Sequence, residues 1–262
     1  MLQGIATGLQ RQIDAGVRDR VSQQIQGLAQ ALQAGGPAAQ QAAAGAAALT
    51  EFEIPSVEVV VTDVVALADS DPRGAVLGVA ALPLTMGGML GAVLISFAIT
   101  GTSRRLTALA VYGVVGGLAL AGILQGWFGG LQGDYWANAG AIGLSLVAIS
   151  ATIVGFRTLL GNAGIGLGAA LMFFFANPIS GASMPPQFLA GSWGAIGQWF
   201  PPGASATLLR GLSYFPDADA AFPWAVIGGW TLLGVLMILA GAIHRRSKAP
   251  APVAEAGTRV VA

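Results

Sequence analysis

Residues 75–99 read AVLGVAALPLTMGGMLGAVLISFAI, an apolar run without a single charge. A bilayer hydrocarbon core about 30 Å thick is crossed by roughly 20 residues of α-helix, so this run is long enough to span a membrane. The rest of the chain points the same way. Of its 262 residues, 55% are hydrophobic and 9% are charged, whereas soluble domains average about 25% charged residues. The sequence predicts a mainly α-helical, polytopic transmembrane bundle.

Further apolar runs follow the first one along the chain. They cover residues 106–128, 137–156, 163–176 and 222–243. The run at 163–176 is short for a span unless its flanks extend it. We expect five spans within a membrane domain over residues 75–246, with a disordered tail over residues 247–262.

Charged residues between the runs predict the orientation. Basic residues occupy alternate connections, at Arg104, Arg105, Arg157 and the sequence HRRSK over 244–248. The connections between these hold Asp134, Asp217 and Asp219, although Arg73 and Arg210 go against the trend. Cytoplasmic loops are enriched in lysine and arginine. We therefore expect residues 1–74 outside the cell and the C-terminus in the cytoplasm.

The first 74 residues predict an extracellular segment. Apolar residues recur mostly four apart over residues 2–34, which indicates a long amphipathic helix, and residues 56–68 are β-branched and indicate a strand. The helix either packs on its own strand or forms a stalk that pairs with a partner. No basic start followed by an apolar stretch marks a signal peptide. Either the first span drives export, or a longer form carries a sixth, N-terminal span, which we favour.

Catalytic and cofactor motifs are absent from the sequence. The chain has no cysteine, its one histidine is His244, and no phosphate-loop motif occurs. The apolar runs carry no charged residue that could relay protons or bind a metal. A serine hydrolase built on Ser183 or Ser205 would need His244, which the topology puts on the opposite side. We expect no enzyme activity, no metal, no cofactor and no nucleic-acid partner.

Glycine pairs four residues apart recur in the apolar runs. They are Gly87 and Gly91, Gly113 and Gly117, and Gly164 and Gly168. Small residues at this spacing let helix backbones approach closely in membranes. The pairs predict close helix packing, within the bundle or between protomers.

Residues 177–204 read NPISGASMPPQFLAGSWGAIGQWFPPGA. This stretch is too apolar for a solvated loop, and its prolines break any spanning helix. Irregular backbone at membrane depth is tolerated only where protein buries it or where it lines a cavity. We expect an outer re-entrant segment over 177–216, made of half-helices at 185–200 and 201–215. The alternative is an interfacial anchor with no further role.

The residues NPISGASMPPQFL (177–189) and WGAIGQWFPPGASATLLRGLSYF (193–215) resemble the segment before the last span of ABC-2 type export permeases, particularly the YhgE/Pip (phage infection protein) group. The similarity covers about residues 56–245. In that family one span precedes a large extracellular domain and five follow it, so the first span is missing here. The resemblance implies a fold of this kind in a bacterial plasma membrane, with short outer helices that close the exit of a transport path.

The resemblance also implies roles for named residues. A kink at the outer end of the fourth span would consist of Asn177, Pro178, Ser180 and Gly181. The break between the half-helices would consist of Pro201, Pro202 and Gly203. Arg104 and Arg105, in the turn over 99–108, would contact a separate ATPase subunit; alternatively, they only set the topology.

From these features we expect an export permease subunit for a lipid-like or amphipathic substrate. It would act in the lipid bilayer as a homodimer or heterodimer. The alternative is a non-transporting scaffold or receptor of the cell envelope.

Overall fold

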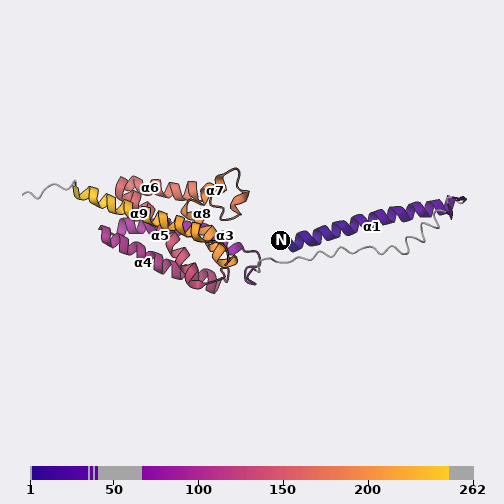
Figure 1. Ribbon diagram of the computed structural model, residues 1–262, viewed down its shortest axis with the longest axis horizontal. Coiled ribbons are helices and arrows are strands. Elements are labelled where there is room, and N and C mark those ends of the chain that lie inside the picture. The colour runs from indigo at the N-terminus through magenta and orange to yellow at the C-terminus, as the bar shows by residue number, and fades with distance from the viewer. Residues whose placement is uncertain (1, 35, 38, 41–66, 248–262) are drawn as a thin grey trace, which may run out of the picture. The chain divides into compact units, whose positions relative to one another are not determined.

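The computed structural model describes residues 2–34, 36–37, 39–40 and 67–247, and the chain divides into two units, Met1–Val64 and Val65–Ala262. In the first unit, α1 (Leu2–Ala34) confirms the helix predicted over residues 2–34 (Figure 1). Its Ile13 and Ile25 are exposed. The predicted strand lies almost wholly outside the described residues, and so does the tail from residue 248 onward.

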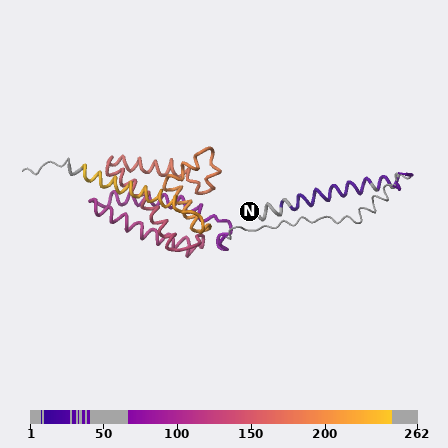
Figure 2. Tube along the Cα trace, viewed as in Figure 1, coloured from indigo at the N-terminus to yellow at the C-terminus, as the bar shows by residue number. Residues whose placement is uncertain are grey.

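The second unit is a helical bundle, and the residues described in it contain no strand. Its α-helices are α3 (Ala75–Ala98), α4 (Thr102–Ala121), α5 (Tyr135–Leu160), α6 (Asn162–Ala170), α7 (Trp193–Gly197), α8 (Pro201–Tyr214) and α9 (Ala221–Ser247). Wider π-helical turns extend α4 over Gly122–Trp127 and α6 over Leu171–Ala176. Figure 2 shows the path of the chain through these elements.

Four helices in the described residues are long and apolar enough to cross a membrane: Ala75–Ala98, Thr102–Trp127, Tyr135–Leu160 and Ala221–His244. They coincide with four of the predicted runs, as in a membrane-embedded protein. The remaining run forms the shorter apolar helix Asn162–Ala176. The count of five spans therefore stays a prediction.

The turns at the arginine-rich end are shorter than the sequence predicts. A turn was expected over 99–108 and the apolar run over 137–156 was expected to end before Arg157, but α4 already begins at Thr102 and α5 continues to Leu160. Arg104, Arg105 and Arg157 thus lie on helices. A long arginine side chain can extend its charge beyond a helix end, so the charge does not have to end the helix.

Helix α5 forms the centre of the bundle. It packs against α3, α4, α6, α8 and α9, and 78% of its most apolar 18-residue stretch is buried, against 33% or less in the other three long helices. Its buried apolar residues include Ile142, Leu146, Ile149 and Ile153. The surrounding helices leave large apolar side chains exposed, such as Leu94 at 66%. That pattern fits a bundle whose outer surface faces lipid.

The two ends of the bundle differ in charge. At one end, which we call the basic end, the Arg157 guanidinium lies 5.5 Å from the centre of the Phe97 ring, and the last turns of α9 pack on Thr158. Arg104, Arg105 and His244 belong to the same end. The opposite end, the acidic end, holds the starts of α3, α5 and α9.

Carboxylates cap helices at the acidic end. Asp71 accepts hydrogen bonds from the backbone amides of Ala75 and Val76, each at 2.9 Å, and Asp134 accepts one from Ala137 at 2.7 Å. A carboxylate at a helix N-terminus satisfies amides that lack a partner within the helix. The alternation of basic and acidic connections along the sequence therefore gives the folded bundle one basic end and one acidic end.

The first glycine pair holds a tyrosine between α3 and α4. The Tyr112 hydroxyl donates to the carbonyl oxygen of Gly87 at 2.6 Å. A Cβ atom added at Gly91 would lie 2.5 Å from the Tyr112 ring. The absence of a side chain at Gly91 makes room for the ring, whereas a Cβ atom at Gly87 would lie 3.7 Å from the Tyr112 hydroxyl, an ordinary contact.

The other two pairs pack against α5. Gly113 and Gly117 face Gly143, where a Cβ atom would lie 2.5 Å from the Gly113 carbonyl oxygen. Gly164 and Gly168 lie against the last turns of α5. The sequence left open whether the pairs pack within the bundle or between protomers. The structure places all three inside the bundle.

Candidate functional site

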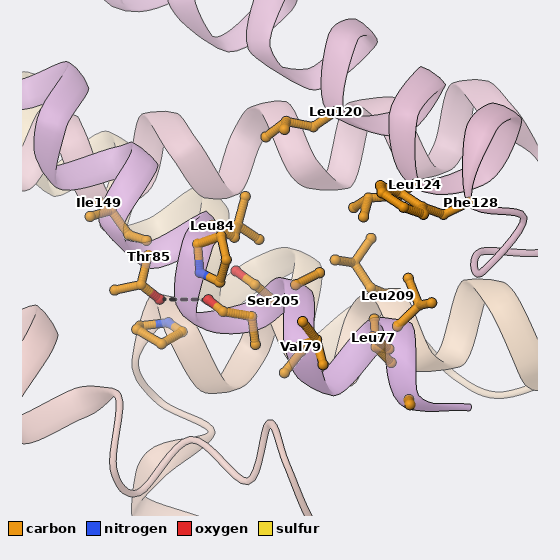
Figure 3. Close-up of a pocket in the computed structure, with 17 residues that line it drawn as sticks. Leu77, Val79, Leu84, Thr85, Leu120, Leu124, Phe128, Ile149, Ser205 and Leu209 are labelled. Atoms are coloured by element: carbon orange, nitrogen blue, oxygen red, sulfur yellow. Dashed lines mark hydrogen bonds between the residues drawn. The ribbon is translucent and has the colours of Figure 1, made fainter. Parts of the chain in front are cut away.

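An apolar cleft of about 380 Å³ opens between α3, α4 and α8, with α5 behind it (Figure 3). The first half of α3, over residues 75–85, forms one wall, and the last turns of α4 form another. The cleft therefore lies in the half of the bundle nearer the acidic end. Its larger apolar lining residues are Leu77, Val79, Leu84, Leu120, Leu124, Phe128, Ile149 and Leu209.

Among the lining residues, Thr85 and Ser205 alone carry polar side chains, and both have partners within the protein. Thr85 Oγ1 donates to the carbonyl of Ala81 at 3.1 Å, one turn back. Ser205 Oγ lies 2.7 Å from Ser145 Oγ on α5 and 2.5 Å from the carbonyl oxygen of Pro201. The surface left to a ligand is hydrocarbon, which suits an acyl chain and not an ion.

Helix α8 begins at half depth in the bundle. Ser145 is ten residues into α5, about 15 Å from its start at 1.5 Å per residue. Since Ser205 contacts Ser145, the first turns of α8 lie at that level. At the other end of α8, the Tyr214 hydroxyl donates to the Gly130 carbonyl at 2.8 Å, in the loop at the acidic end. Helix α8 thus rises from the middle of the bundle to that end.

The chain also leaves α6 at half depth. Asn177 follows the last π-helical turn, and its Oδ1 lies 3.4 Å from Thr85 Oγ1, ten residues into α3. From there the backbone turns toward the acidic end, where Arg210 Nη2 lies 3.3 Å from the carbonyl oxygens of Gly181 and Ala182. It then returns to half depth at Pro201. Residues 177–214 therefore start at mid-bundle, reach the acidic end, return, and reach it again.

The first predicted half-helix forms over only part of its length. Residues 185–200 hold a 3₁₀ turn at Pro186–Phe188 and the five-residue α7 at Trp193–Gly197. Between them Leu189 is extended and Gly191 has a φ of 59°. A left-handed glycine ends a helix readily because it has no Cβ. The second half-helix coincides with α8 to within one residue.

The proposed kink residues lie together, although not in the cleft. Ser180 Oγ donates to the Asn177 carbonyl at 2.7 Å, and Gly181, with a φ of 67°, leaves only 2.8 Å between an added Cβ atom and the Pro186 ring. Pro178 is exposed. These residues line a smaller hollow of about 240 Å³ against Gly78, Ala81 and Leu82 of α3.

The proposed break residues form the first turn of α8. Pro201 and Pro202 occupy its first positions, where a missing amide hydrogen costs no helix hydrogen bond. Pro202 lines the cleft. A Cβ atom at Gly203 would collide with the Gly197 carbonyl, so α7 and α8 meet at backbone distance.

Gln198 connects the kink to α8, and sequence reasoning missed it. Its Nε2 donates to the Ser180 carbonyl at 3.0 Å, and its Oε1 accepts from Thr207 Oγ1 on α8. A polar amide in an otherwise apolar segment was the available signal. Sequence reasoning also missed Arg210, which stood out only as an exception to the charge trend.

The two arginines proposed for ATPase contact have different surroundings. Arg105 Nε donates to the Ile99 carbonyl at 2.9 Å, and its Nη2 donates to the Ser96 carbonyl at 3.2 Å. It therefore caps the C-terminal end of α3, where helix carbonyls lack partners. Arg104, in contrast, is exposed.

Replacing Arg105 should cost stability, whereas replacing Arg104 should not. Arg105→Ala removes two hydrogen bonds from a cationic donor and should lower the free energy of unfolding by about 2 kcal/mol. Arg104→Ala should change it by less than about 0.5 kcal/mol. Unfolding of both purified variants in detergent micelles measures the difference. Equal stabilities would show that Arg105 does not support the end of α3.

No group of three or more metal-ligating side chains lies together in the part of the chain that the structure describes. Comparison with protein-family models, with curated proteins and with solved structures found no match. The resemblance to ABC-2 type permeases accordingly remains an inference from the residues. The function proposed below is based on the cleft.

Proposed function

We propose that this chain is the membrane-embedded permease subunit of an exporter that moves a lipid-like or amphipathic substrate. The observation that carries this proposal is the apolar cleft of about 380 Å³, which reaches half depth and is walled by a helix, α8, that itself starts at half depth. The hydroxyls of its two polar residues already form hydrogen bonds within the protein, so the surface that the cleft offers to a hydrocarbon chain is itself hydrocarbon.

The energetics of the cleft favour exchange over tight binding. An acyl chain that enters it from the bilayer gains no hydrophobic free energy, because lipid tails are as apolar as the wall. Only shape and dispersion contacts make the cleft different from the bilayer interior for an acyl chain. A substrate held so weakly can leave as readily as it enters, which a transport path requires.

The broken segment is the proposed moving part. The extended helix α6 ends at mid-bundle, and α8 begins at mid-bundle. The connection between them includes Asn177, Gly181 and Pro201. Interrupted helices at half depth are a common device for gating in transporters. In the proposed orientation the acidic end faces outward, and residues 177–200 close the outer side of the path.

Energy for export would come from a separate ATPase subunit, since the sequence has no phosphate-loop motif. Arg104 is the candidate contact at the basic end, because it is exposed whereas Arg105 caps α3. Isolation of the tagged native chain should recover an ATPase, and Arg104→Glu should reduce the recovery.

Photo-crosslinking tests the cleft directly. In cells that incorporate a fatty acid with a diazirine at its tail, the native chain should crosslink to lipid at the residues that line the cleft, and peptide mass spectrometry separates these crosslinks from those on the outer surface. Ala80→Trp places an indole in the space that an acyl chain would occupy in the cleft and should reduce the yield at the cleft-lining residues about tenfold, a loss of roughly 1.4 kcal/mol.

Ala98→Trp, on the same helix but outside the cleft lining, is the matched control and should crosslink as the native chain does. If both variants crosslink equally, the cleft holds no lipid chain. If in addition no ATPase is recovered with the native chain, the non-transporting scaffold or receptor becomes the better hypothesis.

A further inference from the structure

A second hollow, of about 720 Å³, lies at the acidic end between the start of α3, residues 182–185 and the end of α8. We call it the arginine groove, and the lining residues that matter here are Arg73, Arg210, Tyr214, Leu82, Met184 and Phe215. It combines two cations with an apolar wall. Leu82, Met184 and Phe215 are each 46–48% exposed.

Arg210 is half-buried, and no carboxylate in the described part of the chain pairs with it. Its Nη2 lies 3.3 Å from the carbonyls of Gly181 and Ala182. Among the residues that the structure describes, neither Arg73 nor Arg210 forms an ion pair. A cation removed from water is costly unless an opposite charge compensates it.

Two polar side chains at this end, those of Asp71 and Tyr214, are already engaged. Asp71 is 6% exposed, and its two carboxylate oxygens accept the amides of Ala75 and Val76. The Tyr214 hydroxyl donates to Gly130. The guanidinium of Arg210 thus keeps donors for a ligand, while the carboxylate that could compete for them caps α3.

We propose that the arginine groove binds the phosphate headgroup of an anionic phospholipid, with the start of its hydrocarbon chains on Leu82, Met184 and Phe215. Arginine pairs with phosphate through two parallel hydrogen bonds, which gives geometry as well as charge. A free phosphate ion would use the arginines and leave the apolar wall without a function. The inference rests on the membrane placement proposed above and does not require transport.

Native mass spectrometry of the delipidated full chain in micelles tests this inference. Dioleoyl phosphatidylglycerol should bind about tenfold more tightly than dioleoyl phosphatidylcholine, because both carry the phosphate but only phosphatidylcholine adds a choline cation, which the two arginines repel. Arg210→Gln should abolish the preference, and Arg73→Gln, at an exposed position, should reduce it about threefold. Arg104→Gln, at the basic end, is the matched control and should retain it.

A second variant protects the test against misfolding of Arg210→Gln. Met184→Glu adds a negative charge at an exposed position in the groove and should also remove the preference. Equal binding of the two lipids to the native chain, or an unchanged preference in Arg73→Gln and Met184→Glu, would overturn the proposal. Competition by glycerol phosphate at the lipid's own concentration would identify a free-phosphate site instead, and would also overturn it. Crosslinking in the cleft reports on acyl tails, so its failure is distinguishable from a loss of headgroup preference.

Discussion

Gly234→Leu is expected to disrupt the bundle, whereas Gly229→Leu, five residues earlier on α9, is expected to leave it folded. A Cβ atom at Gly234 would lie 2.5 Å from the Ala151 carbonyl carbon and 2.7 Å from the Thr152 nitrogen, both backbone atoms of α5. Nothing lies within 4 Å of a Cβ atom at Gly229. The backbone of α5 cannot rotate aside as a side chain could.

Overpacking usually costs 1–3 kcal/mol, and contact with backbone should put Gly234→Leu at about 3 kcal/mol or more. Both substitutions gain the same helix propensity, about 0.8 kcal/mol, so their difference isolates packing. The measurement is thermal unfolding in micelles together with the monodisperse fraction on size exclusion. If the two variants behave alike, α9 does not pack on α5 as the structure has it.

Asn138→Leu is expected to lower the free energy of unfolding by about 2–3 kcal/mol, because it removes two hydrogen bonds that a fully buried amide donates. Asn138 is fully buried on α5. Its Nδ2 donates to the Gln132 carbonyl at 2.8 Å and to Gln125 Oε1 at 3.1 Å. It thereby ties the end of α4 and the following loop to α5.

A double-mutant cycle separates this network from packing alone. Gln125→Leu by itself should cost about 1 kcal/mol, since it removes the hydrogen bond to Asn138 and another from its Nε2 to the Gly133 carbonyl at 2.9 Å. In the Asn138→Leu background it should cost less, because the shared hydrogen bond is already lost. Strictly additive losses, measured by unfolding in micelles, would argue against the network.

Pattern and length were enough to locate the long helices. An uncharged run of about 20 residues satisfies its backbone in a bilayer only as a helix, so 75–99 and 222–243 could be assigned without tertiary information. The same criterion wrongly placed a turn at Arg104 and ended the run over 137–156 before Arg157. A criterion based on uncharged runs ends a predicted helix at the first charged residue, whereas the helix itself continues for as long as its backbone hydrogen bonds do.

The candidate sites were less predictable, because they depend on contacts between distant positions. The proline and glycine residues of 177–203 marked an interrupted segment, and the resemblance suggested its role. No local pattern showed that Ser205 meets Ser145, that Gln198 joins Ser180 to Thr207, or that two arginines contrary to the charge trend line one groove.

By itself the sequence predicted a mainly helical chain, four apolar runs long enough to cross a membrane with a shorter fifth, and an alternation of basic and acidic connections. These properties follow from the composition of each segment and its own backbone hydrogen bonds. Only the tertiary structure decided that α5 is central, that the glycine pairs pack inside the bundle, and that α3, α4 and α8 leave an apolar cleft between them. In a membrane, apolar faces gain nothing by pairing with one particular neighbour, so close packing at glycines and a few buried hydrogen bonds select the arrangement.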